Sequence, residues 1–273
     1  MASFRSLAIF ILGTFGFSWS LWALMMLSSR GLLPFHFPTN FLGSFGPLVG
    51  ALLAGWLSRE AGAVRGILRS LVAWRVHPLW YAVCLLGPAI VMALAAAAVS
   101  ALDGAVPALQ HLDRWYLVFP VGLLILLVGG PLGEEVGWRG YLQPWLQPRL
   151  GPLAASAVIA VVWFVWHMPL FWLEGAAQRG ESLPLFGITI LTFAVLFTWV
   201  YNRTGGSLLM AILFHTGTNT PSFLVSVAAS ALDARPLYQH LTLGLLASIA
   251  LAVVVVTRGR LGQTDRSAGA TDR

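Results

Sequence analysis

The sequence predicts an all-α membrane protein, a bundle of about eight transmembrane helices around a polar site, and three observations support this. First, 58% of the 273 residues are hydrophobic and the mean hydropathy is +0.81, which would leave a soluble protein with extensive exposed apolar surface. Second, apolar runs of about 20 residues, the length that crosses a bilayer as a helix, recur along most of the chain. Third, charged residues make up only 10% of the chain, against about 25% in an average soluble domain.

The apolar runs define the expected helices in order along the chain. We expect them near residues 5–29, 41–58, 79–101, 115–132, 152–173, 185–202, 206–230 and 238–257. The first run is too long for the apolar core of a signal peptide and no small-residue cleavage site follows it, so we interpret it as a transmembrane helix. Residues 133–148 follow the fourth run, and Pro131 with its neighbouring glycines predicts a broken helix there.

No internal repeat or soluble segment interrupts this pattern. Residues 1–257 are therefore expected to form a single transmembrane domain, with the candidate catalytic motifs in 115–230. Residues 258–273 are polar and predict a disordered cytoplasmic tail. Gly46 and Gly50 form a small-xxx-small pattern, which allows two helices to approach closely.

The arginines set the expected orientation, because all 16 basic residues are arginine and they concentrate on one side of the bilayer. With the N-terminus inside, twelve fall in cytoplasmic segments: Arg5, Arg59, Arg65, Arg69, Arg75, Arg139, Arg149, Arg203, Arg258, Arg260, Arg266 and Arg273. Only Arg30, Arg114, Arg179 and Arg235 fall on the other side. This bias places both termini in the cytoplasm. The charge of +6 thus reflects membrane topology, and we expect a lipid bilayer and no nucleic acid as partner.

Residues 59–77 carry four arginines among apolar residues, and Arg65 and Arg69 share one helical face. The pattern predicts an amphipathic helix at the membrane surface. Such a helix either fixes the topology alone or binds anionic lipid or a substrate tail.

The pair Glu134–Glu135 is the first of three polar clusters within the later apolar segments. An ionisable residue at membrane depth is costly, and by default it indicates a functional site with a partner. Glu135 and Arg139 are four residues apart with the acid first, the better order for an ion pair. Glu134 points about 100° away around the helix and is free to act on another group. We expect Glu134 to carry chemistry with support from Glu135 and Arg139; the alternative is a buried ion-pair network that only joins helices.

The other two clusters contain histidines, His167 four residues after Trp163 and His215 four residues before Asn219. Taken singly, each would be read as a hydrogen-bonded packing group. Together with Glu134, they supply a carboxylate, two imidazoles and a carboxamide, which can activate water and stabilise an oxyanion. Glu134, His167 and His215 also form a ligand set suited to catalytic Zn²⁺. The sequence contains no H-E-x-x-H, G-x-S-x-G or Walker-type motif.

In this order and on successive hydrophobic segments, the clusters resemble the CPBP family of intramembrane proteases, which includes type II CAAX prenyl endopeptidases and bacteriocin-processing or self-immunity proteins. The family motifs E-E-x-x-x-R, F-x-x-x-H and H-x-x-x-N correspond to Glu134–Arg139, Trp163–His167 and His215–Asn219. Trp163 replaces the phenylalanine of the second motif and keeps an aromatic wall. The resemblance spans about residues 115–230.

The resemblance implies a role for each matched residue. Glu134 and His167 would activate the water that attacks a peptide carbonyl. His215 and Asn219 would stabilise the oxyanion, while Glu135 and Arg139 support the site. Both a Zn²⁺ mechanism and a metal-free mechanism with Glu134 as base remain open.

We therefore expect an intramembrane endopeptidase of a bacterial plasma membrane. Its substrate would be a hydrophobic or amphipathic peptide or a membrane-protein tail, cleaved near the cytoplasmic side of the bilayer. Two alternatives use the same residues differently. A transporter would use them as a proton relay and should show an inverted repeat, which is not visible, and a non-enzymatic self-immunity or membrane-assembly protein would use them for helix packing.

Overall fold

The computed structural model describes residues 3–35, 37, 40–58, 61–103, 112–228 and 236–263. Every regular element within these residues is a helix, which confirms the predicted all-α fold. Five stretches are long and apolar enough to cross a bilayer. They are α1 (Phe4–Ser29), Leu79–Leu102 of α4 (Leu79–Asp103), α8 (Pro152–His167) with the short helix η4 (Met168–Phe171), α9 (Leu183–Arg203) and α12 (Pro236–Val256). A sixth span results if the bent pair Arg114–Val128 and Pro131–Leu150 is counted as one.

Among the described residues, these five or six spans are fewer than the eight or so that the sequence predicts. Helix α2 (Gly46–Leu57) has 12 residues, about 18 Å of helix, which is too short to cross a hydrocarbon core of about 30 Å. Helix α10 (Leu208–Ala228) has the length of a span but carries the polar run His215–Thr220, and it is not among the five apolar spans. Short, interrupted helices of this kind are tolerated where protein, rather than lipid, surrounds them.

Helix α2 and the 3₁₀-helix η1 before it (Phe41–Phe45) lie against α1 at close range. A Cβ atom at Gly46 would overlap the Ser18 hydroxyl, and one at Gly50 would overlap the Thr14 side chain. Ser18 Oγ also donates a hydrogen bond to the Gly43 carbonyl at 2.7 Å. The small-xxx-small pattern therefore serves the close helix contact that the sequence predicts.

The fourth apolar run breaks as expected. Helix α5 (Val118–Val128) has no buried residue, and the chain then bends by 41° into α6 (Pro131–Gly137), which lies inside the bundle. Gly130 precedes α6 with φ +116°, a conformation that favours glycine, and Pro131 occupies the first turn. A π-helical turn, η3 (Trp138–Leu142), and helix α7 (Gln143–Leu150) continue from α6.

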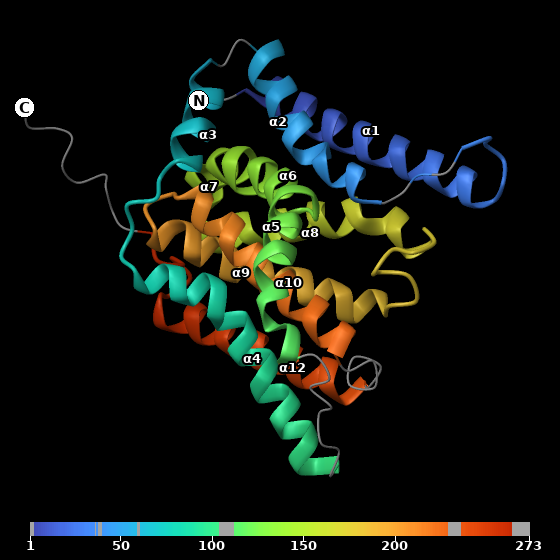
Figure 1. Ribbon diagram of the computed structural model, residues 1–273. Coiled ribbons are helices and arrows are strands. Elements are labelled where there is room, and N and C mark those ends of the chain that lie inside the picture. Colours follow the sequence, from blue (N-terminus) through green and yellow to red (C-terminus); the bar gives the residue numbers. More distant parts are fainter. Residues whose placement is uncertain are drawn as a thin grey trace, which may run out of the picture.

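One end of the bundle, which we call the terminal face, gathers the start of α1, helix α7 and the ends of α9 and α12 (Figure 1). The rings of Phe4 and Trp145 meet there with centroids 5.2 Å apart. Asn202 Nδ2 donates to the Leu261 carbonyl at 3.1 Å, and Leu261 is fully buried. The first residues of the predicted tail, 258–263, are therefore packed against the bundle, and residues 264–273 lie outside the described residues.

The other end of the bundle, which we call the loop face, gathers the end of α1, η1, η4 and the start of α9 (Figure 1). Trp22 Nε1 donates to the Asn40 carbonyl at 3.1 Å, and Trp19 Nε1 donates to the Trp166 carbonyl at 3.0 Å. These bonds tie the loop before η1 and the end of α8 to α1.

The predicted surface helix is present as α3 (Ala61–Leu71). Its Ile67 is 3% exposed, whereas Arg65 and Arg69 are exposed. Ser207 Oγ donates to the Ala73 carbonyl at 2.7 Å, which places the segment after α3 beside the start of α10 at the terminal face.

Candidate active site

Glu134 lies in the middle of α6 with its side chain in the bundle interior. Two glycines allow α6 to lie this close to η1 and to the start of α2, since a Cβ atom at Gly133 would overlap the Ser44 carbonyl and one at Gly137 would overlap Pro47. Glu134 is 6% exposed, and its Oε2 accepts a hydrogen bond from Trp163 Nε1 at 2.7 Å. The indole therefore fixes the orientation of the carboxylate.

Glu135 forms the ion pair with Arg139 that the spacing predicts. Arg139 Nη1 lies 3.1 Å from Oε2 and 3.2 Å from Oε1 of Glu135, and both residues are fully buried. Glu135 Oε1 also accepts a hydrogen bond from His215 Nδ1 at 2.8 Å. Glu135 is therefore shared between the arginine and a histidine 80 residues away, which local spacing does not reveal.

Arg139 is counted with the cytoplasmic arginines in the sequence, but its guanidinium is buried within the bundle. It lies over the Phe197 ring at 4.4 Å and over the Trp163 ring at 5.0 Å from the ring centroids. Arg139 Nε and Nη2 have no hydrogen-bond partner among the described residues. Contact with the two aromatic faces takes the place of those hydrogen bonds, because an aromatic face attracts a cation.

His167 ends α8, and its ring is fixed by the backbone of the preceding turn. Its Nδ1 lies 2.8 Å from the Trp163 carbonyl. A carbonyl only accepts hydrogen bonds, so Nδ1 carries the proton and Nε2 keeps its lone pair. The ring packs between Trp163 and Phe186, with centroid distances of 5.9 and 5.2 Å.

His215 and Asn219 lie one turn apart on α10, as their spacing predicts. Because Nδ1 of His215 is occupied by Glu135, Nε2 is the ring nitrogen left for other contacts. The Thr218 hydroxyl donates to the His215 carbonyl at 2.7 Å and lies 3.3 Å from Asn219 Oδ1. The close approach of α4 holds this turn in place, since a Cβ atom at Gly217 would overlap the Cys84 carbonyl.

A single pocket of about 600 Å³ unites four of the predicted residues, namely Glu134, His167, His215 and Asn219. Trp163 also lines it, whereas Glu135 and Arg139 lie behind the pocket wall. The structure therefore brings together the residues predicted to act and separates them from the pair predicted to support them.

The pocket contains further residues that the motifs do not indicate. Its aromatic walls include Trp22, Trp166, Phe186, Phe193 and Phe197. Its rim includes Asn40, Phe41, Gly175, Gln178 and Glu181. The rim residues come from the start of η1 and from the two loops that precede η1 and α9, where apolar periodicity carries no information, so no sequence signal identifies them.

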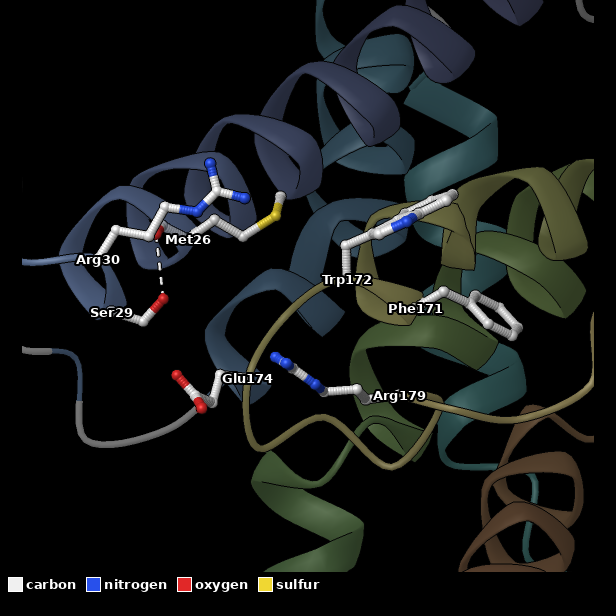
Figure 2. Close-up of a pocket in the computed structure, with 7 residues that line it drawn as sticks. All are labelled: Met26, Ser29, Arg30, Phe171, Trp172, Glu174 and Arg179. Carbon is white, nitrogen blue, oxygen red and sulfur yellow. Dashed lines mark hydrogen bonds between the residues drawn. The ribbon is translucent and has the colours of Figure 1, made fainter.

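A second pocket of about 350 Å³ lies at the loop face (Figure 2). It is lined by Met26, Ser29, Arg30, Phe171, Trp172, Glu174 and Arg179. Figure 2 shows the Arg179 side chain pointing towards Glu174 on the same loop, with the Glu174 carboxylate turned away from it. None of the predicted catalytic residues lines this pocket.

The three candidate Zn²⁺ ligands do not form a preassembled metal cluster. In the part of the chain that the structure describes, no three His, Cys, Asp or Glu side chains are placed to hold one metal ion. Nδ1 of His167 and of His215 each has a protein partner, which leaves Nε2 of both rings available, and Glu134 accepts a hydrogen bond from an indole. The steps proposed below are therefore carried by the protein's own side chains.

The helical bundle and its pocket define a polytopic membrane protein with an intramembrane carboxylate–histidine site. The family model for Type II CAAX prenyl endopeptidase Rce1-like proteins matches residues 114–221, which contain all three motifs. A curated relative, CAAX prenyl protease 2 of Methanococcus maripaludis, is 28% identical over 141 residues. That alignment covers 50% of this chain and 49% of the relative, so the chain matches about half the length of that protein. These similarities confirm the resemblance to the CPBP family that the motifs predict.

Proposed function

We propose that the chain is an intramembrane endopeptidase that hydrolyses a peptide bond with a water molecule activated by Glu134 and His167. The observation that carries this proposal is the shared pocket, in which Glu134, His167, His215 and Asn219 face one volume of about 600 Å³. A carboxylate base, an imidazole acceptor and two oxyanion donors are the groups that such a hydrolysis needs.

Glu134 is the proposed general base. It takes a proton from the water while the water oxygen attacks the carbonyl carbon of the scissile bond. The tetrahedral intermediate then collapses, the carbon–nitrogen bond breaks, and Glu134 gives its proton to the leaving amine. The Trp163 N–H holds the carboxylate in one orientation through this cycle, at 2.7 Å from Oε2.

The two histidines act differently because their Nδ1 partners differ. His167 donates to a backbone carbonyl, so its Nε2 accepts a hydrogen bond and orients the attacking water. His215 donates to a carboxylate, which suits a doubly protonated ring whose Nε2–H faces the oxyanion. Asn219 supplies the second donor from the next turn of α10. Glu135 and Arg139 hold His215 in place and do not touch the substrate.

The proposed substrate is a hydrophobic or amphipathic peptide or part of a membrane protein. The aromatic pocket walls favour apolar side chains, and the multi-pass helical bundle gives access to the membrane. The name of the relative indicates a prenylated protein as its substrate. That indication applies to the relative and is not carried over to this chain. We place the chain in the plasma membrane with both termini in the cytoplasm, because the arginines concentrate at the terminal face.

Cleavage of a hydrophobic reporter-peptide library by the purified protein in lipid tests the proposal. The Glu134→Gln variant should lose activity by about 100-fold or more, the size of a general-base contribution. Glu174→Gln, which alters a carboxylate of the second pocket, is the matched control and should retain activity. Equal cleavage by Glu134→Gln and the wild type would contradict the proposed base.

The same assay addresses the remaining alternatives. Activity that survives a chelator supports the metal-free steps, whereas loss that Zn²⁺ restores would support the metal alternative. A self-immunity or assembly function that persists in folded Glu134→Gln protein would favour the non-enzymatic reading.

A further inference from the structure

The arginines of the described residues divide between the two ends of the bundle. Arg5, Arg65, Arg69, Arg75, Arg149, Arg203, Arg258 and Arg260 lie at or next to the terminal face. Arg30 and Arg179 lie at the loop face, whereas Arg114 lies in the 3₁₀-helix η2 (Leu112–Leu117) before α5 and belongs to neither face as defined. Arg139 belongs to neither group, since it is buried in the site. The terminal face thus carries eight arginines and the loop face two, so the positive-inside rule assigns the terminal face to the cytoplasmic side.

The pocket extends towards the loop face. Its rim is formed by Asn40 and Phe41 before α2 and by Gly175–Glu181 before α9. Phe41 is 43% exposed, and Gly175 and Glu181 are exposed as well. His167 is the last residue of α8, about 22 Å of helix from Pro152 at the terminal face. The catalytic groups therefore open onto the end of the bundle that is poor in arginine.

The pocket is closed towards the terminal face. Glu135, Arg139 and Gln143 are fully buried beneath it, and Leu142 and Leu208 are 1% and 0% exposed. The guanidinium of Arg139 fills the space between the rings of Trp163 and Phe197. These buried residues separate the pocket from the arginine-rich end of the bundle.

We propose that the catalytic pocket opens to the extracytoplasmic side of the membrane and takes an apolar peptide segment presented on that side. The substrate part of this proposal rests on the proposed function; the side of opening does not. It replaces the expectation of cleavage near the cytoplasmic side, because that expectation placed Glu134 by its position in the chain and not by the pocket that it faces.

The two parts of the pocket indicate how such a segment is recognised. Phe186, Phe193 and Phe197 form an aromatic interior along α9, which suits apolar side chains. Gln178 and Glu181 form a polar rim, which suits a backbone or polar residues that remain in water. The substrate class is therefore an exported peptide, or the extracytoplasmic end of a membrane helix, with apolar residues at the scissile bond.

Cysteine labelling in intact cells tests the side of opening without any need for activity. Glu181 and Arg203 flank α9 at its two ends, and both are exposed. Thr189 lines the pocket between them. Each is replaced by cysteine, and a small membrane-impermeant thiol reagent is added before or after permeabilisation. The wild-type chain is the blank, because its single cysteine, Cys84, is 0% exposed.

We expect Glu181→Cys and Thr189→Cys to be labelled in intact cells, and Arg203→Cys only after permeabilisation. The reverse pattern would overturn the orientation. Labelling of Glu181→Cys without Thr189→Cys in intact cells would overturn the opening of the pocket on that side. Elution of each variant as a monodisperse peak in detergent establishes that it is folded.

Vesicles of defined orientation test the substrate side. A membrane-impermeant apolar reporter peptide is added to right-side-out and to inverted membrane vesicles, each with wild type and with Glu134→Gln. We expect Glu134-dependent cleavage in right-side-out vesicles and its loss in inverted ones. Cleavage in inverted vesicles alone would overturn the entry side and leave the peptidase intact. Cleavage in neither, with the expected labelling pattern, would count against the peptidase and leave the orientation standing.

Discussion

Helices α5 and α6 are two halves of one bent span, and their surroundings are opposite. No residue of α5 is buried, and Leu123 and Leu124 are 58% and 59% exposed. In α6 every residue except Leu132 is buried. The bend at Gly129–Gly130 moves the chain from the outside of the bundle to its centre. Within this bent span, Arg114–Leu150, carboxylates occur only beyond the bend, where protein groups rather than lipid surround them.

The largest effect is expected from the charged network that α6 brings inside. Arg139→Met would leave Glu135 buried with His215 as its remaining partner. Breaking a buried ion pair from one side costs about 3–5 kcal/mol. We expect a large drop in the thermal unfolding midpoint in detergent and a low folded yield.

Arg69→Met on the exposed surface of α3 is the matched control. A surface change of this kind stays within about 0.5 kcal/mol of the wild type. Equal unfolding midpoints for Arg139→Met and Arg69→Met would show that the buried pair does not stabilise the interior half of the span.

A second, smaller effect is expected from the packing of the two halves. Gly137→Ala in α6 adds a Cβ atom that would overlap Pro47, and overpacking of a core costs about 1–3 kcal/mol. Gly122→Ala in α5 meets only Thr220, at 3.6 Å, an ordinary contact. Because alanine is the better helix former, this second change should be neutral or stabilise the protein by about 0.5–1 kcal/mol.

Thermal unfolding of both alanine variants in the same detergent measures the difference. If Gly122→Ala lowered the unfolding midpoint as much as Gly137→Ala, the contrast between a packed α6 and a peripheral α5 would not hold.

The smallest effect on stability is expected from Trp163→Phe, which keeps an aromatic wall and removes one hydrogen bond to Glu134. A hydrogen bond to a charged group contributes about 1.5–3 kcal/mol. We expect kcat/KM to fall by about tenfold or more, which is 1.4 kcal/mol or more, while the unfolding midpoint changes little.

Trp172→Phe is the control, since Trp172 is 58% exposed and lines the second pocket. Unchanged kcat/KM in Trp163→Phe would mean that the indole N–H does not orient the carboxylate during the reaction.

The contrast between α5 and α6 also marks what the sequence predicts well. Local spacing predicts the Glu135–Arg139 pair and the shared face of His215 and Asn219, because residues four apart on a helix are neighbours. Pro131 and its flanking glycines predict the break. The all-α membrane fold follows from apolar runs of the right length.

Contacts between distant segments are not predictable in this way. His215 pairs with Glu135, and Trp163 donates to Glu134, because helices from three parts of the chain pack together. The sequence predicts a span at the short α2 because its residues are apolar. In the structure these apolar residues contact neighbouring helices rather than a full bilayer. The loop residues at the pocket rim show no apolar periodicity. Their place in the pocket is recognised only from the three-dimensional packing of the ends of α1, α8 and α9.

The wall that α5 gives the pocket has one more consequence. Ile125 and Gly129 line the pocket, whereas Leu124 and Leu127 on the same helix are exposed on the surface of the bundle. A bound peptide and the acyl chains of the bilayer would then lie on two sides of a single helix. The fluidity of the surrounding lipid thereby becomes a variable in the proposed peptide hydrolysis, much as solvent viscosity does for a soluble protein with a mobile lid.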